Sequence, residues 1–237
     1  MNSNLEMPSW LDGNLLGFDT ETTGISTARD RIATVSLIER NQDEDTVHNW
    51  VINPGVPMPP KASEVNGLTD EYLQKNGVAP EVGLEEVAQR LSDAMLARTP
   101  VVGFNVVFDI KILESELARH GLATLRARLG TDPFPVIDPL VLDRSLDRYR
   151  RGKRRLANVC AAYELPPRQD FHTAEADVSA TLDLLGAVLR RYPEIGKMSL
   201  EELAAYQRQA HRDWAESLTE YRQSQNPNAR PIDSQWL

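Results

Sequence analysis

The sequence has almost no cysteine, because Cys160 is the only one among its 237 residues. A single thiol cannot form a disulfide framework or a cysteine-based zinc site, so the reducing cytoplasm is the expected location of the chain. Long hydrophobic runs are also missing, and no apolar stretch approaches the ~20 residues of a membrane helix. Residues 1–10 lack the basic and apolar parts of a signal peptide. We therefore expect a cytoplasmic chain that is neither secreted nor embedded in a membrane.

Basic residues are scarce as well. The chain has 26 Lys and Arg against 35 Asp and Glu, a net charge of −9, whereas nucleic-acid-binding proteins usually carry a basic surplus. Taken alone, this deficit argues against a polyanionic partner. Residues 148–155, however, hold six basic and no acidic residues, which leaves 20 basic against 35 acidic residues, or −15, elsewhere. This stretch is either a solvated linker between helices or a loop that contacts phosphates. In the second case the contacting side chains are Arg150, Arg151, Arg154 and Arg155.

With 41% hydrophobic residues, a chain of this length is expected to form one globular domain that buries roughly 70–75% of its unfolded surface. Three short apolar segments rich in β-branched residues are separated by polar loops. This pattern predicts three strands in an antiparallel meander. The segments are residues 15–18, which lead into Asp19, residues 32–38 and residues 46–52.

Further along the sequence, the hydrophobic pattern changes from strands alone to strands that alternate with helices. Residues 82–95 have helical periodicity. A short apolar run at residues 100–104 leads into Asn105, a residue suited to cap the following helix. Asp138 followed by Pro139 marks the start of another helix. An antiparallel start followed by this alternation predicts an α/β fold with a mixed sheet flanked by helices.

The chain is expected to divide into three parts. Ser199 and Glu202 form a capping-box pattern that starts a polar terminal helix. Beyond it lies an irregular tail in which Trp236 is either an anchor for a partner or part of a disordered end. The expected parts are an N-terminal extension at residues 1–13, the main domain at residues 14–192, and the helix and tail at residues 193–237.

Four acidic residues and one histidine stand at the ends of predicted strands or the starts of predicted helices. Asp19 and Glu21 are two residues apart on a strand, so both side chains leave on the same face. Asp109 lies in the first turns of a helix, where a carboxylate also suits the helix dipole. His172 precedes Thr173, which opens the helix that carries Asp177. Each residue has an ordinary structural explanation when taken alone, such as a solvated turn or a cap, so their meaning depends on context.

Taken together, three segments resemble the DnaQ-like 3′→5′ exonuclease family. They are Phe-Asp-Thr-Glu-Thr-Thr-Gly at residues 18–24, Gly-Phe-Asn-Val-Val-Phe-Asp at residues 103–109, and His-Thr-Ala-Glu-Ala-Asp-Val-Ser-Ala-Thr at residues 172–181. Linking segments at residues 53–55, 66–71 and 136–138 match the family in the same order. The resemblance covers about residues 14–192, and the ordered set is far more specific than any one segment.

The resemblance implies a ribonuclease-H-like fold with a mixed five-stranded sheet, to which this chain adds a C-terminal helix. It implies that two divalent cations, Mg²⁺ or Mn²⁺, lie about 3.5–4 Å apart in the active site. Their implied ligands are Asp19, Glu21, Asp109 and Asp177. Such hard ions prefer oxygen ligands, which carboxylates provide. His172 is the implied general base, because the unperturbed pKa of histidine, about 6.5, lies close to physiological pH.

The implied reaction is hydrolysis of the last phosphodiester at a single-stranded DNA 3′ end, with release of a nucleoside 5′-monophosphate. Proofreading or repair beside a polymerase or replisome partner is the implied setting. An alternative substrate is RNA or short oligonucleotides, because the sequence does not show whether a 2′-hydroxyl fits. Another alternative is a catalytically silent nucleic-acid-binding or replisome-assembly module. That reading predicts loss of a carboxylate or of the base, whereas all five residues are present.

Substrate contacts are expected from side chains in and near the motifs. Family members often carry His at the positions of Phe104 and Asn66, so the nucleotide pocket is expected to differ in detail. Thr22 is the expected contact to the terminal sugar, and Phe108 is either a base-stacking platform or a core residue. Together with the four arginines, the expected substrate-binding residues are Thr20, Thr22, Asn66, Asn105 and Phe108.

Overall fold

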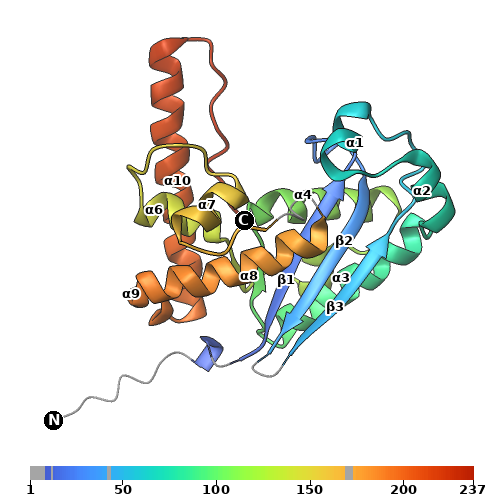
Figure 1. Ribbon diagram of the computed structural model, residues 1–237, viewed down its shortest axis with the longest axis horizontal. Helices are drawn as coiled ribbons and strands as arrows, with labels where there is room; N and C mark the ends of the chain where they lie inside the picture. The colour runs from blue at the N-terminus through green and yellow to red at the C-terminus, as the bar shows by residue number, and fades with distance from the viewer. Residues whose placement is uncertain (1–8, 12, 42–43, 169–172) are drawn as a thin grey trace.

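A computed structural model describes residues 9–11, 13–41, 44–168 and 173–237. Its centre is a five-stranded sheet in the order β3-β2-β1-β4-β5 (Figure 1). The first three strands pair antiparallel, whereas β4 and β5 run parallel to β1. The predicted α/β fold with a mixed sheet is therefore confirmed. The strands are β1 Leu15–Thr22, β2 Ile32–Arg40, β3 Asp45–Val51, β4 Val101–Val102 and β5 Val136–Ile137.

Helices cover both faces of the sheet, with α8 on one face and α3 and α4 on the other (Figure 1). Short helices such as α1, α2, α5 and α9, of seven residues or fewer, were not predicted because so few turns show no clear 3.6-residue periodicity. The helices are α1 Pro60–Asn66, α2 Asp70–Asn76, α3 Pro80–Leu96, α4 Val106–Arg119, α5 Leu125–Leu129, α6 Pro139–Leu146, α7 Leu156–Ala162, α8 Ala174–Arg191, α9 Pro193–Gly196 and α10 Leu200–Gln225.

Strand β1 divides its side chains between the two faces. Leu16 and Phe18 belong to the core cluster formed with α3 and α4. Gly17 points to the opposite face, where a Cβ atom would lie 2.3 Å from Cγ1 of Val178 on α8. A glycine inside a strand can mark such a close approach. Because side chains alternate along a strand, Asp19 also leaves β1 on the face toward α8.

Three predicted helix starts are confirmed. Thr173 accepts a hydrogen bond from the Ala176 N–H at the start of α8. Ser199 and Glu202 form the reciprocal capping box of α10. Asp138 caps α6 by accepting a hydrogen bond from the Leu140 N–H.

The predicted cap of α4 is wrong in its chemistry. Asn105 occupies the N-cap position, but its φ of 65° is left-handed and its side chain makes no capping hydrogen bond. Instead, the carboxylate of Asp138 accepts hydrogen bonds of 3.1 Å from the N–H groups of Asn105 and Val106. Asparagine tolerates the left-handed conformation better than most residues. A carboxylate 33 residues away along the chain therefore caps α4.

Helix α10 and the tail pack against the sheet domain. The buried side chain of Gln207 accepts a hydrogen bond from the Asp138 N–H at 2.7 Å and donates to the Val136 carbonyl at 2.9 Å. Trp236 is 3% exposed and belongs to the core cluster beneath α3 and α4. The expectation that Trp236 is a partner anchor or part of a disordered end is therefore wrong, because the tail inserts it into the chain's own core. None of the described helices is long and apolar enough to cross a membrane.

Candidate active site

Three carboxylates meet where β1 ends against the start of α8. Asp19 and Glu21 lie on β1, and Asp177 lies in the first turn of α8. One ligand oxygen from each lies within 4.8 Å of the others. The close packing of α8 on Gly17 explains this meeting, since Val178 follows Asp177 directly and rests on β1.

Asp109 lies beside this set, on the first turn of α4. It is 4% exposed, and its Oδ1 accepts hydrogen bonds from the backbone N–H of Thr20 at 3.1 Å and from the Thr20 hydroxyl at 2.6 Å. Thr20 therefore faces α4 and orients Asp109. The charge of Asp109 raises the pKa values of both Asp19 and Glu21. All four predicted carboxylates thus gather in one electrostatic centre, with three of them in the closest set.

Burial and mutual repulsion raise the pKa values of these acids. Burial is the largest cause for Asp19, whose pKa lies well above its ordinary value, followed by the charges of Asp109, Glu21 and Asp177. For Glu21, burial followed by the charges of Asp177 and Asp109 raises the pKa to about 7. Burial raises the pKa of Asp109 to about 7, although its hydrogen bonds with Thr20 act in the opposite direction. The centre therefore favours protons or cations.

The donor set fits a hard divalent cation. Asp19, Glu21 and Asp177 each offer a carboxylate oxygen, and Mg²⁺ and Mn²⁺ prefer such ligands. Metal ligands must be deprotonated, so a cation would replace the protons that the raised pKa values retain at this centre.

The residues expected near the nucleotide are engaged in several local contacts. A side-chain hydrogen bond from Asn66 lowers the pKa of Glu21, while Oδ1 of Asn66 accepts from the Leu68 N–H at 3.0 Å. These two contacts orient the Asn66 amide beside the carboxylates. The Thr22 hydroxyl donates to the Gly24 carbonyl at 2.7 Å. Phe108 is half-buried and packs against the core.

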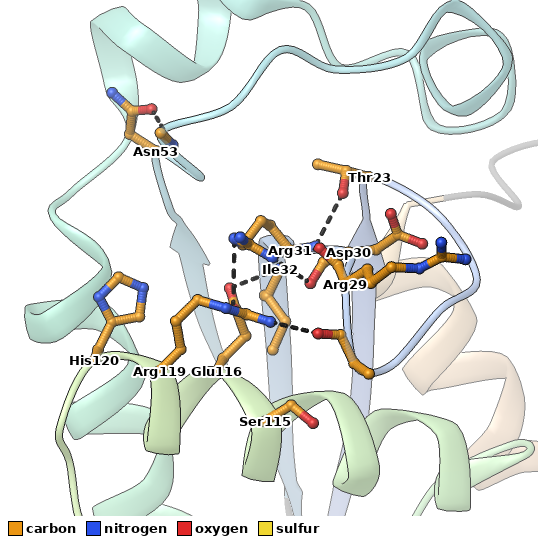
Figure 2. A network of polar contacts seen from close by, with 12 residues as sticks. Thr23, Arg29, Asp30, Arg31, Ile32, Asn53, Ser115, Glu116, Arg119 and His120 are labelled. Atoms are coloured by element: carbon orange, nitrogen blue, oxygen red, sulfur yellow. Dashed lines mark hydrogen bonds and ion pairs between the residues drawn. The ribbon is translucent and has the colours of Figure 1, made fainter.

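The loop after Thr22 is fastened to α4 by a buried carboxylate. Figure 2 shows Glu116 of α4 beside the guanidinium groups of Arg31 and Arg119. Glu116 is 1% exposed and also accepts a hydrogen bond from the Ile32 N–H at 3.2 Å. Arg119 donates to the Ala28 carbonyl at 2.8 Å. Glu116 therefore fixes the loop that directly follows the Asp19–Glu21 motif.

The basic segment holds half-buried and exposed arginines. Arg150 and Arg154 both donate to Oδ2 of Asp143, which is fully buried. Their side chains therefore have a structural role that the interpretation as a phosphate-contacting loop did not include. Arg151 and Arg155 are exposed and remain available for phosphate.

Sequence reasoning missed two residues that shape this centre. Gly17 admits α8 to β1, and a glycine within a strand pattern was the available signal. Asp138 was recognised as the cap of α6, but nothing in the sequence indicated that it also caps α4. His172 lies outside the described residues, and Thr173 at the N-cap of α8 is the described residue that follows it.

Comparisons with known proteins place this geometry in a family. A family model described as an exonuclease, RNase_T, matches residues 16–185. The DNA polymerase III PolC-type of Lacticaseibacillus paracasei is 29% identical over 189 residues, which cover 78% of this chain and 12% of that protein. The PolC-type polymerase of Caldanaerobacter subterraneus subsp. tengcongensis is 26% identical over 199 residues, covering 84% of this chain and 13% of that protein. The chain thus spans about one eighth of the length of these relatives.

Solved structures of exonuclease I share the fold. The enzyme from Methylocaldum szegediense superimposes with a TM-score of 0.63 at 23% identity, covering 77% of this chain and 42% of that one. An E. coli exonuclease I complex with single-stranded DNA and a zinc ion gives a TM-score of 0.67 at 20% identity, covering 84% and 43%. Since the family model spans most of the sequence, the chain belongs to the RNase_T exonuclease family, in the DnaQ-like 3′→5′ exonuclease group that its motifs indicate.

Proposed function

We propose that this chain removes nucleoside 5′-monophosphates from the 3′ ends of single-stranded DNA with the help of two divalent cations. The observation that carries the proposal is the set of Asp19, Glu21 and Asp177, whose oxygens lie within 4.8 Å of one another. Asp109 adds a fourth carboxylate beside them. Two ions are expected because four acids exceed what one hard cation needs for charge balance.

The chain's own residues prepare this chemistry. Asp19, Glu21 and Asp177 would hold the cations, with Asp109 as the fourth ligand. When bound, the ions supply activation of the attacking water and stabilisation of the leaving 3′ oxygen. Thr20 holds the Asp109 carboxylate in place through its hydroxyl and its backbone N–H. Asn66, beside Glu21, is proposed to contact the terminal nucleotide, and Thr22 its sugar. Asn105, at the N-cap of α4, and Phe108, in its first turn, complete the proposed pocket.

His172 is proposed as the general base, on the strength of the family motif at residues 172–181. General-base catalysis contributes about 10²–10⁴-fold to a rate. His172→Ala is therefore expected to lower kcat by that factor while Mg²⁺ affinity stays unchanged. The pH dependence of kcat separates this role from a structural one, because the acidic limb should disappear in the variant. A variant that keeps the limb and the rate would contradict the assignment.

The assay that tests the function uses 5′-labelled single-stranded DNA and RNA of one sequence, with Mg²⁺, Mn²⁺ or chelator. We expect a ladder of DNA shortened from the 3′ end that chelator abolishes. A preference for RNA would replace DNA by RNA as the substrate, since accommodation of the 2′-hydroxyl distinguishes the two. No degradation of either polymer would contradict the proposal.

Arg151 and Arg155 are proposed as phosphate contacts, because they are the exposed members of the four arginines that the sequence singled out. Arg150 and Arg154 are left out of the test because they hold Asp143. Replacing Arg151 and Arg155 with Ala should weaken strand binding and lower its salt dependence. Unchanged affinity across a salt titration would refute this role.

A place beside a replicative polymerase is supported by the DNA polymerase III relatives. The setting proposed is proofreading or repair. Co-purification of the tagged chain with a DNA polymerase III subunit, retained after nuclease treatment that removes bridging DNA, is the expected result. A chain recovered alone under those conditions would favour an enzyme that works by itself.

A further inference from the structure

A groove of about 430 Å³ lies between α6, the arginine segment and α10, apart from the carboxylate centre. Figure 1 shows α6, α7 and α10 together at one end of the molecule, while β1 and the start of α8 lie nearer its middle. Arginines line one wall and the other wall belongs to α10. The side chains that matter are Arg144, Arg148, Arg150 and Arg154 on the first wall and Trp214 and Tyr221 on the second.

Arg144 presents unused hydrogen-bond donors inside this groove. Its guanidinium carbon lies 3.7 Å from the centroid of the Trp214 ring. Among the described residues, it donates no hydrogen bond and forms no ion pair within 4 Å. Burial lowers the pKa of Arg144, since desolvation penalises its charge. Stacking fixes the plane of the guanidinium, and its N–H edges stay free for an anion.

The other arginines are held at fixed positions. Arg150 and Arg154 share the single buried carboxylate of Asp143, and Nε of Arg150 lies 3.3 Å from Asp147. Arg148 makes one long hydrogen bond of 3.4 Å to Ser217 on the opposite wall. A ligand with stronger acceptors would displace this contact at little cost.

The surroundings of the groove are cationic although the chain is acidic. Its four arginines lie near four carboxylates, those of Asp138, Asp143, Asp147 and Asp213, so the positive surplus comes from the neighbouring exposed side chains. The same segment adds Arg151, Lys153 and Arg155, which are exposed. The positive charge of a chain with a net charge of −9 is therefore concentrated around this groove.

Aromatic rings accompany the arginines. Tyr221 on the α10 wall is 64% exposed, and Tyr149 beside Arg148 is 88% exposed. Single-stranded nucleic acid is bound by cations that follow its phosphates and by rings on which its bases stack. An acidic peptide would use the arginines but has no planar bases for the rings. The combination therefore favours a nucleic-acid strand.

We propose that this groove binds the phosphates of single-stranded nucleic acid upstream of the 3′ end that enters the carboxylate centre. The inference rests on the proposed function, because it extends the path of the same substrate. Asp138 connects the groove to the carboxylate centre through the backbone. It caps the start of α6, which carries Arg144, and the start of α4, which carries Asp109. A strand held in the groove would be kept near the centre between successive cleavages.

The test measures binding of 5′-fluorescein-labelled dT20 to the full chain by fluorescence anisotropy, with EDTA present so that no hydrolysis occurs. Arg144→Gln and Arg148→Gln are each expected to weaken binding about fivefold to tenfold and to lower the salt slope by about 0.7 per lost phosphate contact. Arg212→Gln is the matched control, because Arg212 is an exposed arginine of α10 that does not line the groove. Its affinity should equal that of the parent chain.

If Arg144→Gln unfolds, Arg148→Gln still tests the groove, since Arg148 is exposed and its side chain donates only that one long hydrogen bond among the described residues. Unchanged dT20 affinity in both variants would overturn the groove. Unchanged dT20 affinity together with weakened binding of a labelled oligoglutamate peptide would also overturn it in favour of a peptide site. If Arg148→Gln weakens dT20 binding but the parent chain hydrolyses neither DNA nor RNA, the proposed function is contradicted and the groove is not. If the parent chain hydrolyses DNA but both arginine variants bind dT20 as tightly as the parent, the groove is contradicted and the proposed function is not.

Discussion

Two kinds of carboxylate lie inside this molecule, and they differ in what surrounds them. Asp19, Glu21 and Asp177 face one another, and among the described residues no Lys or Arg forms an ion pair with Asp19 or Glu21. Asp143 and Glu116 are at least as deeply buried, yet each meets two arginines. The first group repels itself, which raises pKa values. The second is neutralised by the chain.

This difference separates a site from a structural element. An acid that the fold has already paired with arginines gains nothing from a cation, whereas a cluster of mutually repelling acids becomes more stable when a cation binds. Acidic residues in the sequence look the same in both cases. Their surroundings in the fold decide which of them can take part in chemistry, so each prediction below acts on one of the two groups.

The largest effect is expected for Asp19→Asn. A bound metal ion stabilises the transition state by several kcal/mol, so losing this ligand should slow hydrolysis of labelled dT20 about 10³-fold, at 1.36 kcal/mol per tenfold. The metal-free variant should be no less stable than the parent chain, because one repelling charge is gone. Single-turnover rates and thermal melting measure both quantities. Asp132→Asn, which removes an exposed carboxylate outside the cluster, is the control. A rate for Asp19→Asn within threefold of this control would contradict the assignment.

Asp143→Asn is expected to lower the stability of the fold, which Asp19→Asn does not. It leaves Arg150 and Arg154 without their shared carboxylate, and breaking a buried ion pair costs about 3–5 kcal/mol of unfolding free energy. Denaturant titration measures the loss. Asp147→Asn is the matched control, since its more exposed carboxylate contacts Arg150 at 3.3 Å and should cost less than about 1 kcal/mol. Equal losses in the two variants would show that Asp143 is not the structural centre of this segment.

Glu116→Gln should also lower the free energy of unfolding, but by less than Asp143→Asn does. The amide keeps an acceptor for the Ile32 N–H but removes the charge between Arg31 and Arg119. Hydrogen bonds to charged groups contribute about 1.5–3 kcal/mol, which sets the expected loss of unfolding free energy. Glu114→Gln on the same helix, where one oxygen accepts from the Arg126 N–H, is the comparison. If Glu116→Gln is as stable as the parent, the arginines do not depend on its charge.

The smallest effect concerns metal and pH. The pKa values of Glu21 and Asp109 are raised to about 7 from ordinary values near 4, so the metal-free fold is favoured by protonation and loses stability as pH rises through 7. Deprotonation also frees the ligands for metal. Mg²⁺ at tenfold its Kd adds about 1.4 kcal/mol, or about 3–6 °C in Tm. We expect this increment at pH 8 and a smaller one at pH 5.5. An equal increment at both values, or one that persists in Asp19→Asn, would argue against binding at this cluster.

The sequence alone predicted most of what is local. Apolar periodicity predicted β1 and α3, and the caps Thr173 and Ser199 were readable because a cap and its partners lie within a few residues. The four carboxylates were identified from strand alternation, which places Asp19 and Glu21 on one face, and from the order of the three motifs. These features depend on contacts between residues close in sequence or on the resemblance to a family.

Tertiary structure decided what depends on distant partners. The Asp138 carboxylate reaches the start of α4 across 33 residues, and Trp236 fills a core formed by much earlier segments. The sequence predicted Arg150 and Arg154 as phosphate contacts, whereas in the fold both donate hydrogen bonds to Asp143. Charge, hydrogen bonding and burial act through space, so the same residue types become ligands, caps or ion-pair partners only when the chain has closed. The sequence determined which acids and bases exist, and the fold determined which of them lie beside a group of opposite charge and which lie beside one another.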